Sequence, residues 1–324
     1  MQERKCICAI KEVCMKNYCA AIDFGTNTAR LLIAERVAGK LVPVLVKREV
    51  VRLGGGFTDE RGLSEEACQR GLVCLQRFAA IISGYGVREV RASATSAVRD
   101  AVNGSLFVDS VFSETGIRLV VIDGNLEARL TLNGVLSGLD SESKVLAVVD
   151  VGGGSTEFTV SSHGSPVFIK SMPIGVVRLT EGFTTVSKMD ERVHAVIDQL
   201  ADDLATSNVI IAEGAELVGT AGTATTLAAI MMEMSDYDYR RVNNYTVSRT
   251  AIAEIYQRLI LLTPQERLAV KGLEKGREDL IIAGMMILMA IMDKFCFQRL
   301  KVSDFGLLEG LALSGGESGW EAKC

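Results

Sequence analysis

The sequence VVDVGGGSTEF, from Val148 to Phe158, joins an apolar run to an acidic residue, three glycines and two hydroxyl side chains. Asp150 stands near the end of the apolar run, and Glu157 follows the hydroxyl residues. The stretch AAIDFGTNTARLLIAE, from Ala20 to Glu35, has the same order of parts, with Asp23 as its acidic residue. This repeat predicts two copies of one α/β domain, with a cleft between the copies.

Each loop has the chemistry of a phosphate-binding turn. Glycine lacks a Cβ atom, so its backbone can approach a ligand closely, and consecutive N–H groups form a nest that binds anions. Carboxylates repel phosphate, so Asp150 and Glu157 are expected to hold a hard cation between themselves and the phosphate oxygens. One such loop alone is equally typical of a tight β-hairpin. Two of them between apolar strands favour a pair of loops that clamps a phosphate chain.

The composition is that of an ordinary globular protein. The chain has 324 residues, of which 48% are hydrophobic and 23% are charged, and its net charge is -5. This length predicts two domains, and the negative charge argues against a nucleic-acid partner. The longest apolar run, 280–292, is too short to cross a bilayer, so we expect a buried helix and no membrane partner. We expect no signal peptide and a cytoplasmic location.

The cysteines do not form a pattern of metal ligands. Four of them, Cys6, Cys8, Cys14 and Cys19, lack the paired C-x-x-C spacing of a zinc site, and the chain has only two histidines. Reduced thiols are therefore the expected state.

The order of expected elements repeats in the two halves of the chain. Each half begins with a three-stranded meander, at 18–23, 29–35 and 41–52 and again at 144–150, 157–162 and 166–173. Alternating helices and strands follow each meander. The expected helices are at 64–85, 96–102, 106–115, 125–136, 190–205 and 223–234, and the further strands are at 89–95, 119–122 and 217–220.

Several motifs resemble those of the exopolyphosphatase/guanosine-pentaphosphate phosphatase family, and they occur in the order of that family. They are AIDFGTNTARLLIAE, ASATSAVRDAVNG, GNLEARLTLNGV, VVDVGGGSTEF, GTAGTATTLA, and GLEKGREDLIIAG with VSDFGLLEGLAL. The family belongs to the sugar kinase/actin/Hsp70 superfamily, so the resemblance implies an α/β fold of two ribonuclease-H-like domains around a central cleft. It divides the chain into an extension, 1–17, a first domain, 18–131, and a second domain, 132–324, whose last helix packs back on the first.

The resemblance also implies an activity, the magnesium-dependent hydrolysis of terminal phosphoanhydrides. Glu127, in LEARL, matches the glutamate that deprotonates the attacking water, and Asp150 and Glu157 match carboxylates associated with the metal. Arg30 and Arg52 are further candidates for contacts with phosphate. The positions that the resemblance implies for phosphate binding are Thr26, Asn27, Thr28, Arg99, Gly152, Gly153, Gly154, Ser155 and Thr156.

The chain departs from the family pattern in three respects, one of which is that residues 1–17 have no counterpart in the family. RLGGG, at 52–56, stands where the family often has RLGEG, so Gly55 replaces an acidic residue. Longer members of the family have an additional helical domain. The chain resembles the short, two-domain members instead. The resemblance to the family implies a homodimer.

Inorganic polyphosphate is the expected substrate, and three alternatives remain open. The first is hydrolysis of guanosine pentaphosphate to the tetraphosphate, which the same loops would serve. The second is a small-molecule kinase, although LEARL in its family context favours water as the acceptor. The third is a non-enzymatic phosphate or nucleotide sensor, against which the intact Glu127, Asp150 and Glu157 argue.

Overall fold

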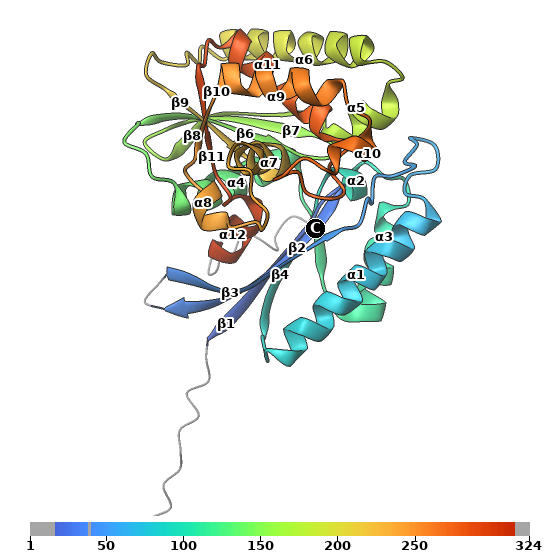
Figure 1. The fold of residues 1–324 in the computed structure, drawn as a ribbon. Helices are drawn as coiled ribbons and strands as arrows, with labels where there is room; N and C mark the ends of the chain where they lie inside the picture. The colour runs from blue at the N-terminus through green and yellow to red at the C-terminus, as the bar shows by residue number, and fades with distance from the viewer. Residues whose placement is uncertain (1–16, 38–39, 315–324) are drawn as a thin grey trace, which may run out of the picture.

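The computed structural model describes residues 17–37 and 40–314, which form two lobes, each built on one β-sheet (Figure 1). The extension predicted at 1–17, with three of the early cysteines, lies almost wholly outside the described residues. The first sheet has the order β3-β2-β1-β4-β5. Its strands are β1 (Tyr18–Phe24), β2 (Thr28–Val37), β3 (Lys40–Val50), β4 (Glu89–Ala94) and β5 (Leu119–Val121).

The first lobe is a meander extended by two parallel strands. β1, β2 and β3 pair antiparallel, whereas β4 runs parallel to β1 and β5 parallel to β4. Two helices, α1 (Glu65–Gly84) and α3 (Gly104–Thr115), pack on one face of this sheet. α1 begins where the sequence predicts, because the Ser64 side chain accepts a hydrogen bond from the Ala67 N–H at 3.2 Å.

The second lobe repeats this topology. Its sheet has the order β10-β11-β9-β6-β7-β8, in which β6, β7 and β8 form an antiparallel meander and β9 and β11 add in parallel. The expectation of two ribonuclease-H-like domains is therefore confirmed, with β10 as an extra antiparallel edge strand. The strands are β6 (Val145–Val151), β7 (Thr156–Ser162), β8 (Ser165–Met172), β9 (Glu216–Thr220), β10 (Thr246–Ser248) and β11 (Arg299–Val302).

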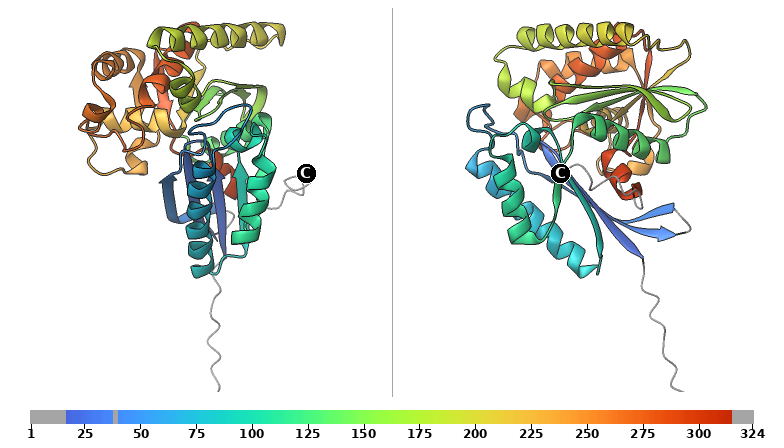
Figure 2. Two further views of the ribbon diagram at one scale, coloured as in Figure 1. Left: turned by 90° about the vertical axis from the view of Figure 1, so that its right-hand side faces the viewer. Right: turned by 180° about the vertical axis from the view of Figure 1, so that it is seen from behind.

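Helices cover the outer face of the second sheet (Figures 1 and 2). The apolar run at 280–292 forms the buried α11, as expected, and α11 contacts α6 and α9. Within the described residues, none of the helices has the length and apolar character needed to span a membrane. The helices of this lobe are α5 (Val176–Gly182), α6 (Val186–Thr206), α7 (Ala221–Met231), α8 (Tyr239–Val242), α9 (Arg249–Ile260), α10 (Pro264–Arg267) and α11 (Ile281–Lys294).

Three helical predictions need correction. The helix predicted at 190–205 begins at Val186, because the Thr185 side chain accepts a hydrogen bond from the Lys188 N–H and caps an earlier start. The helix predicted at 96–102 is the shorter α2 (Ser96–Arg99). The sequence analysis missed α5, whose N-cap is Gly175, a residue without a capping side chain.

Two helices connect the lobes. α4 (Gly124–Gly138) buries residues against both sheets, and α12 (Leu307–Leu313) follows the last strand of the second lobe but packs on β1 of the first. The two helices touch backbone to backbone, since a Cβ atom at Gly310 would lie 1.9 Å from the Leu130 carbonyl oxygen. Because α4 contributes to both cores, the boundary at residue 131 stays a prediction.

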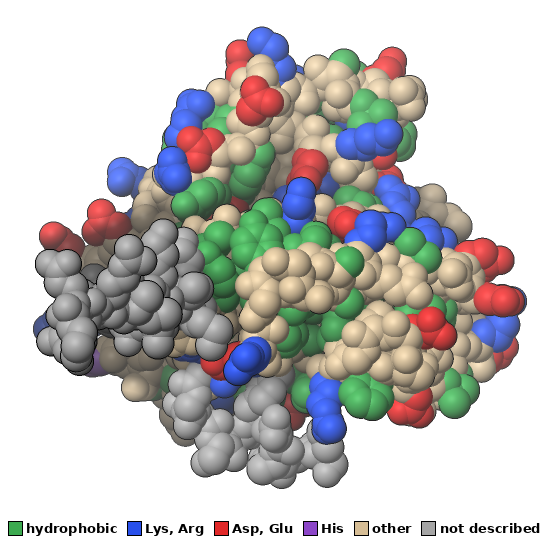
Figure 3. All heavy atoms as spheres, turned by 90° about the horizontal axis from the view of Figure 1, so that it is seen from below, with side chains coloured by type: hydrophobic (Ala, Val, Ile, Leu, Met, Phe, Trp, Pro, Cys, Tyr) green, Lys and Arg blue, Asp and Glu red, His purple; other side chains and the backbone are tan. Residues whose placement is uncertain are grey.

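The outer edge of the first sheet exposes several apolar side chains. β3 is the edge strand, and it exposes Val42, Val44 and Val46. Seen from below, hydrophobic side chains lie among backbone and other polar atoms near the middle of the face, and many charged side chains lie towards its edges (Figure 3).

Candidate active site

A cavity of about 460 Å³ lies between the lobes, and both repeated loops line it. The predicted site residues in its wall are Thr26, Asn27, Thr28, Glu127, Asp150, Gly152, Gly153 and Ser155. Asp23 and the N-terminal residues of α7 complete this part of the wall. Four other predicted residues, Arg99, Gly154, Thr156 and Glu157, do not line the cavity, although Arg99 contacts Glu127 and Glu157 lies opposite Asp150.

The first loop follows β1 and is closed by its own backbone. The Gly25 N–H donates to the Thr28 carbonyl oxygen at 3.1 Å, which turns the chain from β1 into β2. The Thr26 hydroxyl lies 2.9 Å from that of Ser96, at the start of α2. The side-chain oxygen of Asn27 is buried and has no hydrogen-bond partner among the described residues. An acceptor in this state can bind a donor or a cation in the cavity.

The second loop depends on its glycines because it packs against the first loop. A Cβ atom at Gly153 would lie 2.8 Å from Thr26 Cβ, and one at Gly154 would lie 2.5 Å from the Ser96 hydroxyl oxygen. The Thr156 hydroxyl donates to the Ile174 carbonyl oxygen at 2.6 Å. Thr156 therefore stabilises the hairpin, and its hydroxyl is turned away from the cavity.

Three carboxylates lie buried beside the loops. Glu127 is 7% exposed, Asp150 is 9% exposed and Glu157 is 2% exposed. Burial, followed by repulsion from Glu157, raises the pKa of Asp150 from 3.8 to about 7. Burial also raises the pKa of Glu157, while the hydrogen bond from Ser171 opposes this effect. Asp23, at the end of β1, is half-buried near these carboxylates. Desolvation, with the charge of Asp150, raises its pKa to about 6, and Arg30 opposes the rise.

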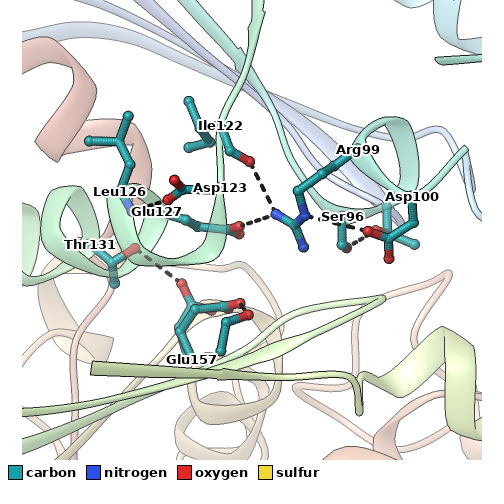
Figure 4. A network of polar contacts seen from close by, with 12 residues as sticks. Ser96, Arg99, Asp100, Ile122, Asp123, Leu126, Glu127, Thr131 and Glu157 are labelled. Carbon is teal, nitrogen blue, oxygen red and sulfur yellow. Dashed lines mark hydrogen bonds and ion pairs between the residues drawn. The ribbon is translucent and has the colours of Figure 1, made fainter. Parts of the chain in front are cut away.

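Glu127 faces an arginine that the sequence also singled out. The Arg99 Nη1 atom lies 3.4 Å from Glu127 Oε2 and donates to the Ile122 carbonyl oxygen at 3.1 Å, as Figure 4 shows. Burial raises the pKa of Glu127 well above 4.5, with further contributions from Glu157 and Asp150, and Arg99 opposes the rise. This carboxyl is thus a stronger proton acceptor than an exposed glutamate once it ionises.

The carboxylates fit a Mg²⁺ ion that also binds substrate. Mg²⁺ prefers oxygen ligands and is commonly held by one or two carboxylates together with phosphate oxygens and water. The Glu157 Oε2 atom is buried without a hydrogen-bond partner in the described chain, so it is free to act as such a ligand. Asp150 lies on the strand next to it, directly opposite Glu157 in the β6–β7 register. No group of three potential ligands is present in the described residues that would hold a metal without substrate.

The structure adds site residues that the sequence analysis missed. Arg178, in α5, donates from Nε to the Gly154 carbonyl oxygen at 2.9 Å and pairs with Asp100 of the first lobe at 2.7 Å. It therefore connects the glycine loop to the opposite lobe. Ser96 and Ser171 were missed as well. None of the three has a local signal, because their partners are distant in sequence.

Arg30 and Arg52, the further candidates for phosphate contacts, pair with carboxylates of the second lobe. Arg30 lies 3.8 Å from Glu309, and Arg52 binds Asp279 through two contacts of 3.0 Å. Arg48, on β3, makes a similar contact of 2.6 Å with Glu274. The Arg48 and Arg52 pairs link β3 and the segment that follows it to the loop before α11.

Comparison with known proteins identifies the chain. Residues 32–317 match the description of the Ppx/GppA phosphatase family. The chain belongs to this family. Exopolyphosphatase 2 of Mycobacterium tuberculosis is 34% identical over 313 residues, which cover 91% of this chain and 97% of the relative. A bifunctional 3-dehydroquinate synthase/phosphatase of Fusobacterium nucleatum is 35% identical over 314 residues, and the chain spans only 46% of its length.

Solved structures of the family share the fold. An exopolyphosphatase from Cytophaga hutchinsonii has a TM-score of 0.83 at 28% identity, covering 92% of this chain and 97% of that one. The Aquifex aeolicus family member has a TM-score of 0.75 at 30% identity, covering 92% and 96%. The resemblance stated from the motifs is therefore confirmed, and the chain is a phosphoanhydride hydrolase of the Ppx/GppA phosphatase family.

Proposed function

We propose that this protein removes the terminal phosphate from inorganic polyphosphate in a reaction that depends on Mg²⁺. One observation carries the proposal: the buried Glu127, Asp150 and Glu157 stand beside two glycine-containing loops that line one cavity. The similarity to an exopolyphosphatase over nearly its whole length supports polyphosphate as the substrate.

The two loops and α7 position the phosphate chain. Gly25 and Gly153 line the cavity wall, and the N-terminus of α7 adds the positive end of a helix. Ser155, whose side chain also lines the cavity, offers a hydroxyl donor. Catalysis of phosphoryl transfer consists mostly of positioning and charge stabilisation, which these groups are suited to supply.

Glu127 acts as the general base. A water molecule attacks the terminal phosphorus in line with the bridging oxygen, and its proton passes to the Glu127 carboxylate as the new P–O bond forms. The bond to the bridging oxygen breaks, and orthophosphate leaves a chain that is one unit shorter. Arg99 holds Glu127 on the side of α2, which orients the carboxylate. Bound Mg²⁺, held through Asp150 and Glu157, would neutralise negative charge on the phosphate oxygens.

Replacement of Glu127 tests this assignment. In the Glu127→Gln variant, phosphate release from polyphosphate should fall by about 10²–10⁴-fold, the usual contribution of a general base. The exposed Glu114→Gln change in α3 is a matched control and should leave the rate unchanged. A Glu127→Gln protein that keeps the wild-type rate would contradict the mechanism, provided that circular dichroism shows both variants folded.

Guanosine pentaphosphate is the second candidate substrate, and the far end of the cavity favours it. Tyr237, Tyr239 and Phe305 line the cavity there, with the rings of Tyr239 and Phe305 edge to face at 6.4 Å. Aromatic side chains of this kind can stack on a nucleobase. Phosphate release from polyphosphate and from guanosine pentaphosphate should be measured side by side. Release from the nucleotide alone would change the substrate and retain the mechanism.

The predicted homodimer stays a prediction. Light scattering coupled to size-exclusion chromatography would measure the mass in solution, and a mass near that of one chain would contradict it.

A further inference from the structure

Ser171 lies where two of the carboxylate-bearing elements meet. It is a residue of β8 and the direct cross-strand partner of Glu157 on β7. Its hydroxyl donates to Glu157 Oε1 at 2.7 Å, and this is a short hydrogen bond to a buried acid. The other oxygen, Oε2, has no hydrogen-bond partner among the described residues. Ser171 thus occupies one oxygen of Glu157 and leaves the other free.

Ser171 also sets the position of α4, the helix that carries Glu127. A Cβ atom at Gly124, the first residue of α4, would lie 2.3 Å from Ser171 Cβ and 2.5 Å from its hydroxyl oxygen. The same atom would lie 3.8 Å from Glu157 Oε1. The start of α4 therefore rests directly on this serine. Glu127 follows Gly124 by three residues, so the two positions share one turn and one side of the helix.

We propose that Ser171 is a positioning residue, which fixes Glu157 with its Oε2 atom free to ligate a divalent cation and holds the first turn of α4 against it. This inference rests on the Mg²⁺ requirement in the proposed function. Ser171 is only half-buried and reaches Glu157 rather than the phosphate loops, so it acts through that carboxylate. Hydrogen-bonding partners of metal ligands typically account for about 10–100-fold in metal affinity or activity.

Binding of Mn²⁺, a spectroscopic substitute for Mg²⁺, tests the proposal without turnover. Free Mn²⁺ would be measured by electron paramagnetic resonance during titration of the metal-free protein, first alone and then with inorganic phosphate. We expect the Ser171→Ala variant to bind Mn²⁺ about 10-fold or more weakly than the wild type. At saturating metal, its KM for polyphosphate should stay within about twofold, because the phosphate loops are unchanged, whereas kcat should fall.

Ser161→Ala is the matched control. Ser161 is another buried serine of the β7–β8 hairpin, and its hydroxyl has no hydrogen-bond partner in the described chain. The Mn²⁺ affinity of the Ser161→Ala variant should equal that of the wild type. An equal loss in Ser161→Ala and Ser171→Ala would assign the effect to general packing and overturn the proposal. Should Ser171→Ala fail to fold, Ser171→Cys replaces the hydroxyl by a much weaker donor, and unchanged Mn²⁺ affinity in it would overturn the proposal as well.

The outcomes separate this inference from the proposed function. A wild-type protein that releases phosphate from polyphosphate yet binds no Mn²⁺ would overturn the role of Ser171 and leave the hydrolase intact. A wild-type protein that releases no phosphate would overturn the proposed function. In that case, weaker Mn²⁺ binding by Ser171→Ala alone would still support the positioning role.

Discussion

Without a bound metal, the charged Asp150 side chain destabilises the folded protein. The neutral side chain of Asp150→Asn should show how much free energy of unfolding this charge costs. The side chain is 9% exposed, and its pKa is raised from 3.8 to about 7, first by burial and then by Glu157. Each pH unit between these two values corresponds to about 1.4 kcal/mol, so the charged form of Asp150 costs up to about 4 kcal/mol. At pH 8 without divalent cations, Asp150→Asn should therefore raise the free energy of unfolding by about 1–4 kcal/mol.

The pH dependence has a definite sign. Because the pKa of Asp150 is higher in the folded than in the unfolded state, the folded state binds more protons between pH 4 and pH 7. The contribution of this group to stability is therefore greatest below about pH 4, falls as the pH rises towards about 7, and is constant above that. Asp150→Asn removes this slope. The difference in the free energy of unfolding between Asp150→Asn and the wild type should grow from pH 5 to pH 8.

Thermal unfolding measured in EDTA at pH 5, 6, 7 and 8 is the appropriate assay. For a protein of this size, 1 kcal/mol corresponds to about 1.5 °C in Tm, so Asp150→Asn should unfold about 2–6 °C higher at pH 8. The exposed Asp109→Asn change should have little effect. Added Mg²⁺ should narrow the difference, since a ligand stabilises the state that binds it. An Asp150→Asn protein that unfolds at or below the wild-type Tm at pH 8 would refute the reasoning.

Two glycine substitutions give further predictions. Gly154→Ala should raise KM for polyphosphate, because its Cβ atom would lie 2.5 Å from the Ser96 hydroxyl oxygen and 3.1 Å from that of Thr26, and would push the second loop away from α2 and the first loop; steady-state kinetics with an unchanged KM would contradict this. Gly310→Ala should lower the free energy of unfolding by more than about 2 kcal/mol, because its Cβ atom would lie 1.9 Å from the Leu130 carbonyl oxygen. Gly84→Ala, which meets nothing within 4 Å, is the matched control, and an equal Tm in the two variants would refute the packing argument.

The fold could be predicted because its signals are local. The strands that end at Asp23 and Asp150 carry their own apolar runs, and the following glycine loops specify turns. The repeat of this pattern indicated two similar domains, which the strand orders confirm. α5 was missed since a short helix capped by Gly175 has neither a long apolar period nor a capping side chain.

The candidate site was less predictable, because much of it arises from long-range pairing. Glu127 was identified only through its resemblance to a family motif, since a single glutamate on a helix carries no signal of its own. Ser171 meets Glu157 through the β7–β8 register, and Arg178 reaches Asp100 across the lobes. Contacts of this kind depend on how elements pack, which no local stretch of sequence records.

The lobes are connected by helix packing and by ion pairs, and these two kinds of contact respond differently to salt. The contact of α4 with α12 is made by backbone and apolar atoms, whereas the Arg48–Glu274 and Arg52–Asp279 pairs are partly exposed. Salt screens exposed ion pairs over a Debye length of about 8 Å at physiological ionic strength and leaves apolar packing in place. Ionic strength therefore acts on these pairs and on the partly exposed Arg178–Asp100 pair, but not on the contact of α4 with α12. Concentrated salt should weaken the contact of β3 with the loop before α11, while the packing of α4 on α12 should be unchanged.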